Sequence, residues 1–215
     1  MEGSPNSLLA YRIAAALYLL DRDFGSAAEL AQAATNLLAT QYERDIALEL
    51  PLHRNGLSSI LATAYTHLFP PQHHAKALRR ADAVLAHNGN DIDALLARAY
   101  VAQAAQKWED ARSGFERVLA LASKTGGSHD AATLRALSIS SAPDLEARAE
   151  MAWCDVHLGR LAPAAEQLRA LVVEMDGERA AQVGDEERAR TWWRLGRCLW
   201  DIGGKYCWPS KRQRV

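Results

Sequence analysis

The sequence predicts an all-α fold, a right-handed solenoid in which antiparallel helix pairs stack in a row. Apolar residues recur at helical spacing along most of the chain, and no window alternates apolar and polar residues as a strand would. Several segments open with an aromatic residue or a leucine that is followed, three positions later, by an alanine. In a related instance, Ala75-Lys76-Ala77-Leu78, Ala77 lies 34 residues before Ala111, and this separation matches the period of a known class of helix-pair repeats.

The bulk composition is that of a folded protein without a strong charge. Of the 215 residues, 49% are hydrophobic and 24% are charged, which argues against disorder. The net charge of -1 gives no long-range attraction for nucleic acid or an acidic membrane, and no apolar run reaches the length of a membrane span. Three cysteines without a CxxC pair are typical of a reducing compartment. We therefore expect a cytoplasmic protein, or one that is also nuclear, without nucleic-acid or membrane partners.

The repeat array is expected to cover residues 7–204, after a flexible N-terminus at 1–6. Its first unit lies near 7–41 and breaks at Asp21-Arg22-Asp23. Apolar residues occupy positions i, i+3, i+4 and i+7 of its first helix, namely Tyr11, Ala14, Ala15 and Tyr18. Ala15 is the small residue that allows a close approach of the return helix, which carries Ala27.

Two further units follow, near 57–88 and 92–122. The second unit is expected to start after the turn signal Asn55-Gly56, and two prolines lengthen its inter-helix turn before Ala77. The third unit has the clearest helical pattern, with Ala99, Trp108, Ala111 and Phe115 among its packed positions.

The last two units are separated by polar inserts. Residues 123–143 contain Gly126-Gly127-Ser128 and are expected to form an insert with room for one short helix. The fourth unit lies near 145–175, with Ala152 in its first helix, Gly159 at the turn and Ala164 in the return helix. A charged insert then leads to the fifth unit, 188–204, which opens with Trp192, Leu195 and Gly196.

The fifth unit is predicted to lack its return helix. Gly203-Gly204 is expected to form a turn, and residues 205–215 have no apolar period and are expected to be unstructured. A lone first helix cannot bury its own face, so the pattern favours a truncated array or non-native terminal sequence over a genuine tail.

The spacing resembles the tetratricopeptide-repeat (TPR) signature W-x2-L-G-x2-Y, which Trp192, Leu195 and Gly196 match and in which Leu199 replaces the tyrosine. Three longer segments, 70–78, 99–111 and 192–204, are similar to the middle region of the fungal-type TPR scaffold subunits of superkiller complexes. The resemblance covers about residues 45–204.

This resemblance implies a scaffold without enzymatic activity or a cofactor. It implies a helicase and WD-repeat subunits as protein partners, in an assembly that feeds messenger RNA to the cytoplasmic exosome for 3′-to-5′ decay. A generic TPR adaptor of another multiprotein complex is the alternative.

Other chemistries have weak support in the sequence. His67, His73 and His74 lack the second ligand pair of a zinc site. Cys154 lies on an apolar helix face, so its proximity to His157 indicates packing rather than a nucleophile. Arg12 alone does not make the Lys/Arg and Asn clamp of chaperone-tail binders. The short basic stretch 211–214 is a weak nucleic-acid signal. We therefore expect no catalytic residue and no metal.

Four aromatic residues are the candidates for partner binding. Alignment of the units places them on or near the wall formed by the first helix of each unit: Tyr100, Trp153, Trp193 and Trp200. They either pack against the next unit or anchor a partner helix or extended segment in a groove.

Overall fold

The computed structural model describes residues 8–41, 50–68, 71–125, 142–177 and 179–207. These residues are largely helical, and none of them belongs to a strand. The α-helices are α1 (Leu8–Leu20), α2 (Phe24–Gln41), α3 (Leu50–His67), α4 (His74–His87), α5 (Ile92–Ala104), α6 (Trp108–Thr125), α8 (Pro143–His157), α9 (Leu161–Asp176) and α10 (Asp185–Cys207), with a short 3-10 helix, η1 (Ala180–Gln182), between the last two. No helix among the described residues is both long and apolar enough to span a bilayer.

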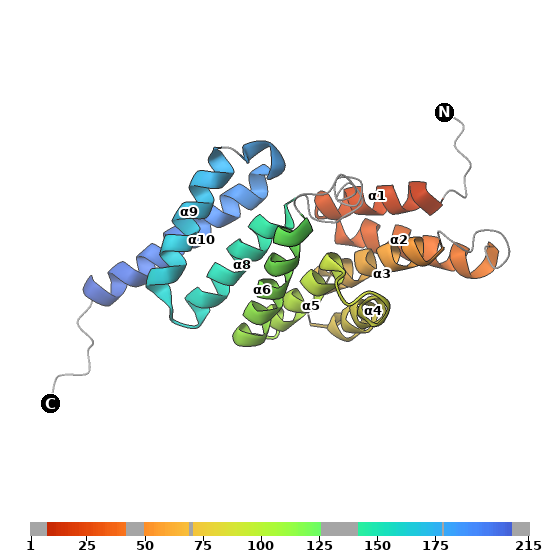
Figure 1. Ribbon diagram of the computed structural model, residues 1–215, viewed down its shortest axis with the longest axis horizontal. Helices are drawn as coiled ribbons and strands as arrows, with labels where there is room; N and C mark the ends of the chain where they lie inside the picture. The colour runs from red at the N-terminus through yellow and green to blue at the C-terminus, as the bar shows by residue number, and fades with distance from the viewer. Residues whose placement is uncertain (1–7, 42–49, 69–70, 126–141, 178, 208–215) are drawn as a thin grey trace.

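The helices form an elongated array of pairs, which confirms the predicted all-α class (Figure 1). The pairs are α1/α2, α3/α4, α5/α6 and α8/α9, and α10 packs on α9. In Figure 1 the array runs from α1 and α2 at one end to α9 and α10 at the other. The predicted N-terminus 1–6, residues 208–215 of the predicted tail 205–215, and most of the insert 123–143 lie outside the described residues.

The same C-cap joins the two helices of three pairs. Arg22, Gln106 and Gly159 have φ values of 58°, 58° and 79°, each just after a first helix. In each case the next residue donates its N–H to a carbonyl five positions back, with N–O distances of 2.8–2.9 Å. This is the hydrogen bond of a Schellman motif. Each return helix then begins two residues after the left-handed residue. Its first residue is the recurrent aromatic residue or leucine of the sequence pattern: Phe24, Trp108 or Leu161.

The recurrent alanines of the return helices are buried in the structure. The four alanines that define the repeat are completely buried: Ala27, Ala77, Ala111 and Ala164. Ala15, Ala99 and Ala152 of the first helices are also buried. In the α5/α6 pair, a Cβ added to Gly114 would lie 2.9 Å from the Cβ of Ala99. Small residues therefore set the distance between the paired helices.

The core is divided into clusters, each shared by neighbouring helices. One cluster joins α1, α2 and α3, another joins α5, α6 and α8, and a third joins α8, α9 and α10. Phe115 is completely buried in the second cluster, and Leu195 lies in the third. Stability that arises from contacts between neighbours is the property of a repeat array.

The start of the second unit differs from the prediction. Helix α3 begins at Leu50, so Asn55-Gly56 lies inside a helix and forms no turn. Pro51 falls in the first turn of α3, where its missing N–H has no intrahelical partner to lose. Gly56 instead provides room for α1, because an added Cβ would lie 2.4 Å from the Cζ of Arg12.

The end of the fifth unit differs as well. The turn expected at Gly203-Gly204 is absent, because α10 continues through both glycines to Cys207. Ile202 packs against the third cluster, and this packing extends the apolar face of α10 to the glycines. Burial thus overrides the helix penalty of about 1 kcal/mol per glycine. Residues 205–207, expected to be unstructured, are helical.

Candidate protein-binding surfaces

The four predicted aromatic residues lie in different environments. The Tyr100 side chain is buried, in edge-to-face contact with Phe115 at a centroid distance of 5.2 Å. Trp153 is half-buried against the third core cluster. Trp193 and Trp200 of α10 are 60% and 77% exposed. The structure therefore brings Trp153 and Trp193 together, with ring centroids 5.5 Å apart, but does not form one stripe from all four.

Aromatic contacts connect α6, α8 and α10. Trp108 stacks on His157 at 3.8 Å, and His157 meets the edge of Trp153 at 4.6 Å. The guanidinium of Arg194 lies over Trp153 at 5.6 Å, within the range of a cation–π interaction. Trp153 therefore packs against side chains of α8 and α10.

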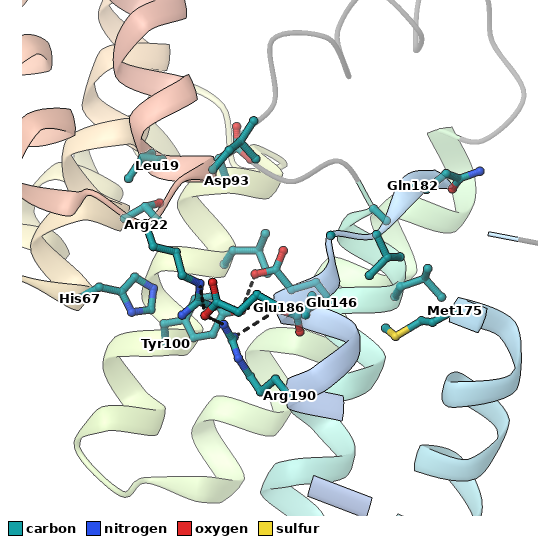
Figure 2. Close-up of a pocket in the computed structure, with 18 of the residues that line it drawn as sticks. Leu19, Arg22, His67, Asp93, Tyr100, Glu146, Met175, Gln182, Glu186 and Arg190 are labelled. Carbon is teal, nitrogen blue, oxygen red and sulfur yellow. Dashed lines mark hydrogen bonds and ion pairs between the residues drawn. The ribbon is translucent and has the colours of Figure 1, made fainter. Parts of the chain in front are cut away.

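A cavity of about 310 Å³ lies where the first helices of the pairs converge. Helices α1, α3, α5 and α8, together with the start of α10, supply most of its lining, and Tyr100 is among the lining residues. Apolar side chains form part of the wall, namely Leu19, Leu20, Phe24, Leu96, Leu145, Met175 and Val183. Charged side chains occupy another part, including Arg22, Glu186 and Arg190, which Figure 2 shows close together.

One edge of the cavity is a contact between the α1–α2 turn and the start of α10. The Nε of Arg22 lies 2.9 Å from Oε1 of Glu186, and its Nη2 lies 4.0 Å from Oε2 of Glu187. Arg22 belongs to the α1–α2 turn, whereas both glutamates belong to the first turn of α10. This ion pair places the turn of the first pair against the last helix.

Behind the cavity lies a buried carboxylate, Glu150 of α8, which is fully excluded from solvent. Its Oε1 accepts a hydrogen bond from Nη2 of Arg194 at 2.7 Å, and its Oε2 accepts one from Nε2 of Gln103 at 2.8 Å. Because Gln103 is on α5 and Arg194 on α10, Glu150 links three helices.

Two aromatic groups of the cavity wall are held neutral. The Tyr100 hydroxyl donates a hydrogen bond to Oε1 of Glu146, and burial together with the Glu146 and Glu150 carboxylates raises the pKa of Tyr100 well above its ordinary value. Burial and the charge of Arg22 lower the pKa of His67 to about 4. His67 is therefore an uncharged ring at neutral pH, stacked on Phe24 at 4.8 Å.

Glu187 is predicted to make stability depend on pH. Burial and the carboxylates of Glu150 and Glu146 raise the pKa of Glu187 from 4.5 to about 7. Between these two values the unfolded chain releases a proton that the folded chain keeps, so stability falls as the pH rises through this window. Glu187→Gln should therefore be more stable than the natural chain at about pH 8, by about 1–3 kcal/mol, and closely similar to it at about pH 4.

Urea unfolding at the two pH values measures this difference. Glu166→Gln is the matched control, because it makes the same substitution at an exposed position of α9. An equal effect of Glu187→Gln at both pH values would contradict the assignment.

The cysteine and histidine candidates have structural contacts. Cys154 is buried, which raises the pKa of its thiol to about 11, so the group is a thiol and not a thiolate at neutral pH. The His73 ring lies beside the Tyr65 ring at a centroid distance of 5.7 Å, whereas His67 stacks on Phe24. Within the described residues, no group of three His, Cys, Asp or Glu side chains is arranged to hold a metal ion.

The polar cluster of Arg22, Glu150, Glu187 and Arg194 was not anticipated from the sequence. Its one visible signal is Glu150, an acidic residue between apolar residues of an expected helix. From a helical pattern alone, an acidic residue is expected to be exposed to solvent. Its burial depends on counter-ions from other helices, which the local sequence does not reveal.

Comparison with known proteins supports the repeat architecture. No family model matches the chain. Over 172 residues, or 80% of this chain, the sequence is 26% identical to Superkiller protein 3 of Saccharomyces cerevisiae, and the match spans 11% of the length of that protein. Among solved structures, the fold is similar to a crystal structure described as a kinesin light chain of Podospora anserina with nearly identical TPR-like repeats. The TM-score is 0.53 at 20% identity, over 95% of this chain and 90% of the other, so the TPR-like fold predicted from the sequence is confirmed.

Proposed function

We propose that the chain is a non-enzymatic protein-interaction scaffold of a superkiller-type assembly that assists exosome-mediated 3′-to-5′ decay of cytoplasmic messenger RNA. The observation that carries this proposal is the 26% identity to Superkiller protein 3, because it extends over 80% of the chain. The TPR-like fold supports it, since stacked helix pairs present extended surfaces for other proteins. The proposed partners are a helicase and WD-repeat subunits, and the proposed location is the cytoplasm.

We further propose that the cavity receives a segment of one partner. Its apolar wall offers burial for apolar side chains, and the charged edge formed by Arg22, Glu186 and Arg190 offers ion pairs that set the orientation. Tyr100, one of the predicted partner-binding residues, contributes to this wall.

Affinity purification of the tagged chain, followed by mass spectrometry, tests the proposal. The expected result is co-purification of a helicase and WD-repeat proteins. Glu186→Arg, which reverses a charge at the cavity edge, should reduce their recovery several-fold, whereas Glu166→Arg on the exposed side of α9 should not. Circular dichroism of both variants checks that the helical content is unchanged.

Two outcomes separate the parts of this proposal. Absence of both partner classes from the natural chain's interactors would reject the superkiller-type assignment and favour a generic TPR adaptor of another complex. Full recovery of the partners by Glu186→Arg would reject the cavity as their binding site while leaving the assignment in place.

A further inference from the structure

The sequence contains two Asn-Gly steps, and the fold places them in different surroundings. Asn55-Gly56 lies inside α3, whereas Asn88-Gly89 lies in the turn between α4 and α5. An asparagine that precedes a glycine is especially prone to lose its side-chain amide, because glycine has no side chain to shield its nitrogen or to restrict its backbone. The reaction needs that nitrogen to reach the side-chain carbonyl carbon of the asparagine. The local backbone therefore decides whether each step can react.

In the α4–α5 turn, the backbone leaves the Gly89 nitrogen open to reaction. Asn88, Gly89 and Asn90 are all exposed to solvent. Among the residues that the structure describes, none accepts a hydrogen bond from the Gly89 N–H. The Asn90 N–H donates to Oδ1 of Asn88 at 3.2 Å. A donor at this oxygen stabilises the negative charge that develops on it when the side-chain carbonyl is attacked.

In α3, the helix protects the other asparagine. Gly56 lies in the helix interior, so its N–H belongs to the hydrogen-bond ladder of α3. Attack on Asn55 would require this part of the helix to open. Opening would also disturb the packing of α1 on α3, because the Arg12 side chain lies so close to Gly56 that an added Cβ would be 2.4 Å from its Cζ.

We propose that Asn88 is a site of self-modification, at which the chain converts asparagine to aspartate and isoaspartate. Asn88 rotates from its ψ of 91°, and the Gly89 nitrogen bonds to its Cγ to close a cyclic imide. The Cγ–Nδ2 bond breaks, and Nδ2 leaves as ammonia with the proton that the Gly89 nitrogen loses. Water then opens the ring, either at Cγ to give aspartate or at the backbone carbonyl carbon to give isoaspartate. The modification is independent of the proposed function.

The products alter the junction between the second and third helix pairs. Asn88 is the C-cap of α4, where a new carboxylate meets the negative end of the helix dipole. The Asn88 carbonyl accepts the Asp91 N–H at 3.1 Å, and the Asp91 side chain caps α5 by accepting the Ala94 N–H at 2.9 Å. Isoaspartate adds a backbone carbon between these two caps, so it changes the turn that joins α4 to α5.

Incubation of the folded chain in ¹⁸O-labelled water, followed by trypsin digestion in ordinary water, tests the proposal. Asn55 and Asn88 fall on separate tryptic peptides, 55–76 and 81–98. Mass spectrometry should show that Asn88 gains label at least about tenfold faster than Asn55, because α3 must open before Asn55 reacts. In the chain unfolded by urea, the two rates should lie within about twofold of each other, since both steps have lost their structure. Chromatography of the labelled 81–98 peptide should resolve an aspartate form and an isoaspartate form.

Gly89→Ala tests whether the Gly89 nitrogen is the nucleophile. An added Cβ at this position would have its nearest neighbours at 3.8 and 3.9 Å, so the variant should fold, but the methyl group crowds the attacking nitrogen. Labelling of Asn88 should fall several-fold. Gly184→Ala is the matched control, because an added Cβ there meets nothing within 4 Å and lies far from Asn88 in the sequence. It should leave the labelling unchanged, and circular dichroism verifies that both variants are folded.

Three kinds of result would overturn the proposal. One is a folded chain whose Asn88 gains no label over a time in which the unfolded chain is labelled. Another is equal labelling of Asn55 and Asn88 in the folded chain, which would show that the α4–α5 turn does not direct the reaction. The third is aspartate without isoaspartate, or undiminished labelling in Gly89→Ala, since either would indicate direct hydrolysis by water.

Discussion

Replacement of Glu150 with leucine should lower the free energy of unfolding by about 3–5 kcal/mol, the typical cost of leaving a buried charge without its counter-ion. Glu150 is fully buried, and the Arg194 guanidinium that pairs with it is almost as inaccessible. The substitution also leaves the Gln103 amide without the carboxylate that accepts its hydrogen bond. Urea unfolding followed by far-ultraviolet circular dichroism measures the loss.

A double variant tests whether the buried pair is the cause. Glu150→Leu combined with Arg194→Met removes both charges, so it should recover most of the stability that the single variant loses. Hydrogen exchange should show faster opening of α10 in the single variant, since Arg194 connects α10 to α8. Equal loss in the single and double variants would contradict the argument and indicate that leucine itself does not fit at position 150.

Gly114→Leu should destabilise the chain by about 3 kcal/mol, at the upper end of the usual cost of overpacking. A Cβ at position 114 would already lie 2.9 Å from the Cβ of Ala99, so a leucine must push α6 away from α5. This shift would also disturb the adjacent core, because the neighbouring Phe115 is fully buried against Tyr100. Thermal and urea unfolding measure the effect.

The same substitution on α10 is the matched control. Gly196 also lies inside a helix, but an added Cβ there meets nothing within 4 Å. Gly196→Leu should therefore be neutral or stabilising by up to about 1 kcal/mol, since leucine is the better helix former. Similar destabilisation by both leucines would show that the α5/α6 contact is not the reason for Gly114.

The regular part of the fold could be predicted because each helix pair repeats one packing rule. Ala27, Ala77, Ala111 and Ala164 carry that rule in the sequence, and all four are buried. The helical period is a local property of the chain, so it can be recognised without knowledge of the neighbouring helices. Gly159 lies at the turn that the sequence predicts, and its φ of 79° explains the choice of glycine.

Glycines elsewhere were ambiguous, because glycine serves both turns and close helix contacts. Asn55-Gly56 and Gly203-Gly204 have the composition of turns, yet α3 and α10 pass through them. At Gly56 the reason is the Arg12 guanidinium of another helix, which no local pattern reveals. Glycine identity alone therefore could not settle the helix ends.

The candidate site could be predicted less completely than the fold. The first helices do line a cavity, and Tyr100 is part of its wall. The burial of Glu150 and the raised pKa of Glu187 depend on charges from α5, α8 and α10, which are brought together only by the tertiary fold. The TPR signature at Trp192 and Gly196 was recognisable, but its exposed state follows from the absence of a covering helix among the described residues.

Arg22 has two structural roles: its backbone forms the α1–α2 turn, and its side chain forms an ion pair with Glu186. Its left-handed backbone is of a kind that glycine adopts more readily, at a cost to other residues of about 1 kcal/mol or more. Glycine at this position would relieve that strain but would have no side chain to reach Glu186. The residue best suited to the turn is thus not a residue that can form an ion pair with α10. A choice made from the turn alone would place glycine at position 22 and would lose the ion pair with Glu186.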